Sequence, residues 1–213
     1  MSVQLSIAIP TGALFQDSVA LLDRAGVATV EPAKLGRRLL MEKDHVRVIL
    51  VRPTDVPAYV DHGAADLGVV GKDVLWESPG RHYELVDLRY GGCRLVVAVP
   101  ESSALQGPET WPPRLRLGTK YPRATASYMG SIGQAVEVVK LHGSVELAPH
   151  VGLADGIVDL TATGRTLRDN HLRVVAEVGA STARLIANQA SIKTRSAVVN
   201  DVVKRLREVV GAS

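Results

Sequence analysis

The residues best suited to chemistry lie in one segment, DGIVDLTATGRTL at 155–167. An apolar run there passes through a threonine-rich turn into a helix that we expect to begin near Arg165. Such a turn points several backbone N–H groups at one spot, where the helix dipole also favours negative charge. Gly164 allows the backbone to approach a ligand closely or to take a positive φ. The pattern predicts a cradle for a phosphate monoester. Its expected members are Thr161, Ala162, Thr163, Gly164, Arg165 and Thr166.

Two carboxylates, Asp155 and Asp159, precede this turn. A carboxylate repels phosphate, but it accepts hydrogen bonds from the vicinal hydroxyls of a ribose or approaches a Mg²⁺ ion. The two carboxylates and the phosphate turn together predict a site that binds a ribose 5-phosphate. The alternative is an ordinary capped turn with solvated acids, because T-x-T-G-x-T is a short pattern. The segment matches neither the Walker A loop nor the dinucleotide-binding G-x-G-x-x-G motif.

Other polar residues follow the ends of apolar runs, where α/β proteins usually form their sites. Arg52 follows VRVILV, and an arginine there either clamps a diphosphate with two hydrogen bonds or pairs with an acid such as Asp55. Asp73 follows DLGVVGK, and it is either a site residue or the N-cap of a helix. Tyr121 follows RLRLGTK and either stacks on a base or covers the surface. Arg37 lies in a polar connection, as a second phosphate ligand or a surface residue.

These candidates must be positioned by alternating strands and helices. Short apolar runs at 3–9, 46–51 and 66–70 are separated by stretches with helical spacing. This alternation predicts βαβ units, mostly parallel sheets and an α/β fold. The apolar residues between 194 and 210 recur at helical spacing and predict a final helix that packs on its own lobe. The best candidate for a domain boundary follows the tyrosine and two glycines at 90–92.

The composition excludes several classes of protein. The 213 residues suit one large domain or two small ones, and 46% apolar residues exclude intrinsic disorder. No apolar run reaches the roughly 18 residues of a membrane span, so we expect no membrane partner. A formal charge of +3 is too small to indicate nucleic acid binding. One cysteine and no recognisable secretory leader indicate a reducing, cytoplasmic location. The six histidines show no metal-ligand spacing.

Five stretches together resemble a known family. They are IAIPTGAL at 7–14, VRPTDVPAYVDHGAADLGVVGKDVL at 51–75, GTKYP at 118–122, VELAPHVGLADGIVDLTATGRTLRDNHL at 145–172 and ARLIANQAS at 183–191. In this order, and over nearly the whole chain, they resemble the short form of ATP phosphoribosyltransferase, which opens histidine biosynthesis. The two long stretches are far more specific than the phosphate turn alone.

The resemblance implies a fold and a reaction. The fold would be two α/β lobes of the periplasmic-binding-protein type II class, with lobe I at 1–92 and 181–213 and lobe II at 93–180. The enzyme would join N1 of ATP to C1 of 5-phosphoribosyl 1-diphosphate and release diphosphate, with Mg²⁺ bound to the diphosphate substrate. The family's short form assembles as a homodimer within a hetero-oligomer that contains a regulatory subunit similar to histidyl-tRNA synthetase.

The resemblance also implies roles for individual residues. The phosphoribosyl diphosphate site would comprise Asp155, Asp159 and all six residues from 161 to 166, and Arg52 would be the catalytic contact to the leaving diphosphate. Gly12, Asp73, Tyr121 and Arg37 would contact ATP. The family's first loop reads P-K-G-R-L, whereas this chain has PTGAL at 10–14 and lacks both cations.

Two alternative functions remain open from the sequence. A cytoplasmic two-lobe sensor would bind a ligand without chemistry, and fold alone does not exclude it. A phosphoribosyltransferase with another base as acceptor would share the phosphate turn, and a panel of free bases tested against ATP would identify it.

Overall fold

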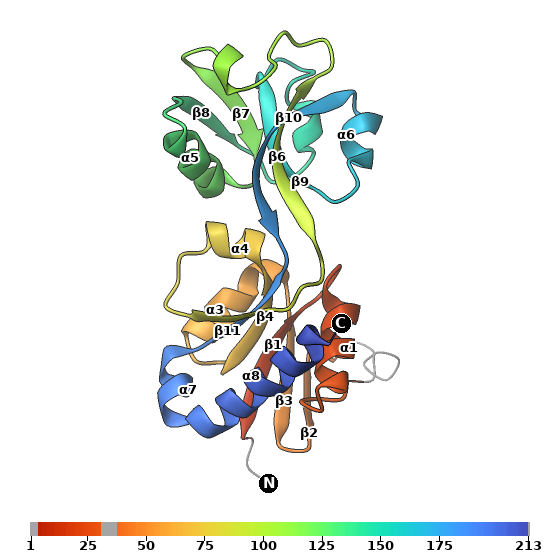
Figure 1. Ribbon diagram of the computed structural model, residues 1–213, viewed down its shortest axis with the longest axis vertical. Coiled ribbons are helices and arrows are strands. Elements are labelled where there is room, and N and C mark those ends of the chain that lie inside the picture. The colour runs from red at the N-terminus through yellow and green to blue at the C-terminus, as the bar shows by residue number, and fades with distance from the viewer. Residues whose placement is uncertain (1–3, 31–37, 213) are drawn as a thin grey trace. The chain divides into compact units, whose positions relative to one another are not determined.

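The computed structural model describes residues 4–30 and 38–212. The chain divides into two compact units, unit 1 at residues 1–91 and 182–213 and unit 2 at residues 92–181. Each boundary lies one residue from the boundary that the family resemblance implies. The C-terminal helices α7 (Gln189–Thr194) and α8 (Ser196–Gly211) belong to the same unit as strand β1 (Leu5–Pro10) (Figure 1).

Unit 1 contains a six-stranded sheet in the order β2-β3-β1-β4-β11-β5. Strand β1 runs parallel to β3 and β4, whereas the other three neighbouring pairs are antiparallel. The strands are β1 (Leu5–Pro10), β2 (Leu40–Lys43), β3 (Val46–Val51), β4 (Leu67–Gly71), β5 (Tyr83–Asp87) and β11 (Ala183–Ala187). The helices are α1 (Phe15–Arg24), η1 (Pro53–Asp55), α3 (Val56–Asp61), α4 (Lys72–Glu77), α7 (Gln189–Thr194) and α8 (Ser196–Gly211).

Unit 2 contains a five-stranded sheet in the order β10-β6-β9-β7-β8. Strand β7 is parallel to both β8 and β9, whereas β6 is antiparallel to β9 and β10. The strands are β6 (Cys93–Pro100), β7 (Leu115–Thr119), β8 (Val136–Lys140), β9 (Gly156–Thr161) and β10 (Leu172–Ser181). The helices are η2 (Pro108–Thr110), α5 (Pro122–Ser131), η3 (Val145–Leu147) and α6 (Arg165–Asp169).

The α/β fold is confirmed, but the sheets are mixed rather than mostly parallel. A parallel pair needs a crossover of about a dozen residues. Only Asp44 and His45 join β2 to β3, so this pair is a hairpin, and both residues have positive φ as tight hairpin turns require. Strand β11 follows β10 after one residue and runs against β4 and β5. No helix connects these antiparallel strands to the preceding strand, so the alternation of strands and helices in the sequence does not indicate their direction.

The core of unit 1 lies on both faces of β1, whose six residues are all buried. Leu5, Ile7 and Ile9 pack with apolar residues of α1 and α8, whereas Ala8 belongs to a second cluster that includes residues of α3. The helix expected near the C-terminus therefore packs on its own unit as predicted. Among the described residues, no helix has the length and the apolar character needed to cross a membrane.

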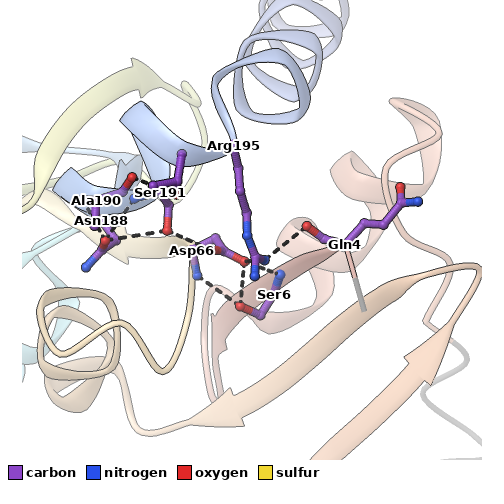
Figure 2. A network of polar contacts seen from close by, with 8 residues as sticks. Gln4, Ser6, Asp66, Asn188, Ala190, Ser191 and Arg195 are labelled. Atoms are coloured by element: carbon purple, nitrogen blue, oxygen red, sulfur yellow. Dashed lines mark hydrogen bonds and ion pairs between the residues drawn. The ribbon is translucent and has the colours of Figure 1, made fainter. Parts of the chain in front are cut away.

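A buried carboxylate ties the C-terminal helices to the sheet of unit 1 (Figure 2). Asp66 is 6% exposed and accepts hydrogen bonds from the Ser6 N–H, the Ser6 hydroxyl and the Ser191 hydroxyl, at 2.6–2.8 Å. Arg195 Nη1 lies 2.8 Å from the same carboxylate and donates to the Gln4 carbonyl at 3.0 Å. Arg195 stands between α7 and α8, so this network fixes the point where the C-terminal segment changes direction.

Candidate functional site

The turn after β9 has the strand–turn–helix form that the sequence predicts. Thr161 ends β9, and α6 begins at Arg165. Gly164 has φ of +74°, the left-handed conformation that glycine adopts without strain. Its N–H donates to the Thr161 hydroxyl oxygen at 2.9 Å, so the ends of the turn are held together by a side chain of the turn itself.

The interior of the turn presents unused hydrogen-bond donors. Within residues 4–30 and 38–212, the N–H groups of Ala162 and Thr163 have no hydrogen-bond partner, and both residues are exposed. Arg168 donates from Nη1 to the Thr163 carbonyl at 3.2 Å and steadies the turn, a role that the sequence pattern did not indicate. Because α6 has only five residues, its dipole is small, and the attraction for an anion comes mainly from these N–H groups and the threonine hydroxyls.

Arg165 lies at the start of α6 and is directed to the surface. Its side chain is 82% exposed and its Nε lies 3.5 Å from the Asp169 carboxylate, one turn along the helix. The Thr166 side chain is also exposed. Both residues therefore stand at the turn, with Arg165 engaged in a weak surface ion pair.

Asp159 lies on β9 two residues before the end of the strand, and it is 8% exposed. Its Oδ1 accepts the N–H of Leu160 at 2.9 Å, and its Oδ2 lies 3.7 Å from Lys120 Nζ. Burial raises the pKa of the Asp159 carboxyl group, and the nearby Glu146 carboxylate raises it further, while the Leu160 N–H and Lys120 offset only part of this effect. Asp159 is thus a buried carboxyl group beside the turn, and its surroundings disfavour the charged form.

The structure places Asp155 at the opposite end of β9 from the turn, and not beside the turn as the grouping with Asp159 predicts. Asp155 precedes β9, whereas the turn follows it. A strand advances about 3.3 Å per residue, so the two positions are about 20 Å apart. The Asp155 carboxylate is bound instead by the N–H of Arg116 at 2.9 Å and by the Arg116 guanidinium at 2.8 Å. Arg116 and Asp155 are 39 positions apart in the sequence, so no local sequence pattern predicts their contact.

The Arg116 pair makes the stability of the protein depend on pH. Burial raises the pKa of the Asp155 carboxyl group, but the hydrogen bonds and the charge of Arg116 outweigh burial and hold that pKa below its usual value. The stabilisation is therefore present above the unfolded-state pKa of about 3.9 and is lost as the pH falls through the lower folded-state pKa.

We expect Asp155→Asn to lower the free energy of unfolding by about 1 kcal/mol at pH 7, a modest value because both side chains are partly exposed. The difference from the wild type should shrink below about pH 4. Urea unfolding at pH 7 and at acidic pH measures it. The matched control is Asp201→Asn, which removes an exposed pair with Arg205 on α8. An equal loss in both variants would contradict the role given to Arg116.

A second group of polar residues lies at the carboxyl ends of three adjacent strands in unit 1. Gly12 follows β1 with φ of +84°, Arg52 follows β3, and Asp73 stands in the first turn of α4, directly after β4. The N–H of Thr11 donates to the Val51 carbonyl at 2.8 Å and joins the first two positions. The parallel pairing of β1 with β3 and β4 brings these residues to one edge.

The structure decides two alternatives left open by the sequence. In the described part of the chain, the exposed Arg52 guanidinium forms no ion pair with Asp55. Asp73 is not the N-cap of α4, because Gly71 occupies that position.

Tyr121 is the N-cap residue of α5 in unit 2, and its N–H donates to the Thr119 hydroxyl oxygen at 2.8 Å. Arg37 lies outside the described residues.

The expected residues thus form two groups. In unit 2 the structure brings the turn, Asp159 and Tyr121 to one edge of the sheet, together with Lys120, which the sequence reading left without a role. In unit 1 it brings Gly12, Arg52 and Asp73 to one edge.

Comparison with known proteins places the chain in a family. A family model described as ATP phosphoribosyltransferase matches residues 52–208, well over half of the chain. The chain belongs to the ATP phosphoribosyltransferase family. An ATP phosphoribosyltransferase from Caldanaerobacter subterraneus subsp. tengcongensis is 46% identical, with 97% of each chain covered. Another, from Rubrobacter xylanophilus, is 48% identical over 93% of each chain.

Solved structures support the family and the fold. The ATP phosphoribosyltransferase (HisG:HisZ) complex from Thermotoga maritima contains a chain that superposes with a TM-score of 0.81 at 34% identity, covering 98% of this chain and all of the other. The periplasmic aliphatic sulphonate binding protein SsuA from Escherichia coli superposes with a TM-score of 0.63 at 12% identity, covering 97% and 68%, and shows the shared fold alone. As an ATP phosphoribosyltransferase, the chain is a pentosyltransferase of histidine biosynthesis.

Proposed function

We propose that this ATP phosphoribosyltransferase holds the 5-phosphate of 5-phosphoribosyl 1-diphosphate in the turn formed by residues 161–166. The observation that carries the proposal is the pair of N–H groups of Ala162 and Thr163, which are exposed and without partners among the described residues, beside Gly164 at positive φ. Backbone N–H groups and hydroxyls that converge on one point bind phosphate oxygens well.

The buried carboxylate of Asp159 accepts hydrogen bonds from the ribose hydroxyls in this proposal. Asp159 lies two residues of extended chain before Thr161, so it is about 7 Å from the start of the turn. This separation suits a sugar whose phosphate lies in the turn. A carboxylate accepts two hydroxyl hydrogen bonds at once, as vicinal hydroxyls require.

Arg52 contacts the leaving diphosphate and is the proposed catalytic residue. As N1 of ATP attacks C1 of the ribose, the N1–C1 bond forms, the bond from C1 to the diphosphate oxygen breaks, and its electron pair leaves with the diphosphate. The guanidinium of Arg52, free of an ion pair within the described residues, stabilises that charge. N1 already carries the attacking lone pair, so the step needs no general base.

Gly12, Asp73 and Tyr121 contact ATP in this proposal, with Arg37 as a further contact. Gly12 and Asp73 follow the same edge as Arg52, which supports a common role. The loop at 10–14 carries Thr11 and Ala13 where the family has two cations, so it contributes backbone groups rather than charge to the triphosphate.

Bound together with the diphosphate substrate, Mg²⁺ would supply positive charge that offsets part of the negative charge of the leaving group. Among the described residues, no three His, Cys, Asp or Glu side chains are grouped to hold a metal ion. Mg²⁺ commonly keeps most of its contacts to water and substrate phosphates, so it needs no cluster of protein ligands. We assign it no protein ligand.

The assembly proposed for this chain is a homodimer within a hetero-oligomer that contains a regulatory subunit similar to histidyl-tRNA synthetase, in the cytoplasm. The support is the Thermotoga maritima structure, which is a complex of HisG and HisZ. No nucleic acid or membrane partner is proposed.

A diphosphate-release assay with ATP, 5-phosphoribosyl 1-diphosphate and Mg²⁺ tests the function, with mass detection of the nucleotide product. It should be run with and without a HisZ-type subunit and with Mg²⁺ omitted as a control. Formation of phosphoribosyl-ATP supports the proposal. Product with a free base in place of ATP would indicate a different acceptor. Binding without product under every condition would indicate a sensor.

A further inference from the structure

Lys120 is held beside Asp159 by the pairing of two parallel strands. It follows Thr119, the last residue of β7, and Thr119 pairs with Val158 of β9. The Thr119 hydroxyl donates to the Val158 carbonyl at 2.7 Å and accepts the Tyr121 N–H at 2.8 Å. The backbone on both sides of Lys120 is thereby fixed, and Lys120 stands opposite Asp159.

The Asp159 carboxylate needs a compensating charge. Its side chain is only 11% exposed, and η3 brings the negative charge of Glu146 close to it. Lys120 Nζ lies 3.7 Å from Oδ2, and among the described residues it is the cation that acts on this carboxyl group. On the neighbouring strand β6, Val96 pairs with Asp159, and Arg94 is engaged with Glu177 of β10 at 3.2 Å.

The Lys120 and Asp159 side chains differ in exposure and in how they are restrained. The Lys120 side chain is 40% exposed, so its ammonium group keeps contact with water and loses little hydration in this position. Asp159 Oδ1 is oriented by the Leu160 N–H, and Oδ2 by the ammonium group. A carboxylate restrained at both oxygens presents its remaining lone pairs in one direction.

We propose that Lys120 is a positioning residue, which holds the Asp159 carboxylate anionic and oriented to accept the ribose hydroxyls of 5-phosphoribosyl 1-diphosphate. The inference rests on the proposed function and adds a residue to its sugar site. Lys120 acts through Asp159, so its effect on binding requires Asp159 to be present.

Isothermal calorimetry of 5-phosphoribosyl 1-diphosphate with Mg²⁺, on the full chain without ATP, tests this dependence. Lys120→Met should raise the dissociation constant about tenfold, as expected when a buried charge loses its partner. Lys120→Arg should restore affinity close to that of the wild type. Asp159→Asn should weaken binding by itself, and adding Lys120→Met to it should cost little more.

Lys140→Met is the matched control. Lys140 ends the neighbouring strand β8, pairs with Thr119 in register, and is exposed. Its removal lowers the net charge equally and should leave binding unchanged. Thermal melting of every variant checks folding, and Lys120→Gln replaces Lys120→Met if that variant melts early.

Two results would overturn the inference. One is wild-type affinity in Lys120→Met and Lys120→Gln. The other is an equal loss of affinity with and without Asp159, which would mean that Lys120 contacts the substrate directly or acts only at long range. Failure of the proposed function looks different, because the wild type itself would then not bind 5-phosphoribosyl 1-diphosphate.

Discussion

Replacing Arg52 with alanine is expected to lower the rate of the chemical step about 10²–10³-fold, the usual effect of removing one contact that stabilises transition-state charge. Substrate binding should change much less, because negative charge gathers on the leaving diphosphate only as its bond to C1 breaks. The measurement is single-turnover product formation in a rapid-quench experiment, with enzyme in excess over 5-phosphoribosyl 1-diphosphate.

The position of Arg52 supports this expectation. It follows β3 in extended conformation, and its carbonyl accepts the Asp55 N–H at 2.9 Å as η1 begins. The backbone is therefore fixed while the guanidinium group is exposed. Removing this side chain should leave no buried partner unpaired, so folding should be retained and the loss should appear in the rate.

Arg47→Ala is the matched control for this experiment. Arg47 lies on β3, the strand that Arg52 follows, but its guanidinium pairs with Glu42 of β2, with nitrogen–oxygen distances of 2.6 and 2.7 Å. Its removal should change stability slightly and the single-turnover rate not at all. If Arg52→Ala retained the wild-type single-turnover rate, the catalytic role proposed for Arg52 would be wrong.

Replacing Gly164 with valine is expected to raise the dissociation constant of 5-phosphoribosyl 1-diphosphate about 10–100-fold. An L-residue in the left-handed region costs about 1–2 kcal/mol, and a β-branched side chain costs more. A Cβ atom at this position would also lie 3.3 Å from Arg168 Nη1. The turn should relax toward negative φ, which would change the directions of the unpartnered N–H groups of Ala162 and Thr163.

Gly133→Val provides the control, because it separates strain from binding. Gly133 also has positive φ, at +70°, and a Cβ atom there would have no heavy atom within 4 Å. It lies in the same unit, in the turn after α5. Both variants should melt at lower temperature than the wild type, but only Gly164→Val should lose affinity in calorimetry. A parallel loss of affinity in Gly133→Val would show that general destabilisation explains the result.

Features that depend on neighbouring residues were predictable from the sequence. Apolar runs located β1, β3 and β4 of unit 1, and the threonine-rich turn with Gly164 predicted the start of α6. Positive φ at Gly164 was one of two alternatives that the sequence left open, and the structure shows it. These signals are local, because a turn or a strand is specified by the residues that form it. The order of five stretches, two of them long, also carried the family resemblance.

Pairing between distant segments was decided only by the tertiary structure. The directions of β11 and β5, the bond of Arg116 to Asp155, and the place of Lys120 opposite Asp159 all depend on which strands become neighbours and in which register. Hydrophobic periodicity reports that a strand is buried, but it carries no information on its partner. The sequence by itself therefore determined the phosphate turn, the family and many of the helices and strands. Sheet order and register decided which charges surround Asp159 and placed Asp155 at the far end of β9, bound to Arg116. Both depend on long-range packing, which local sequence patterns do not specify.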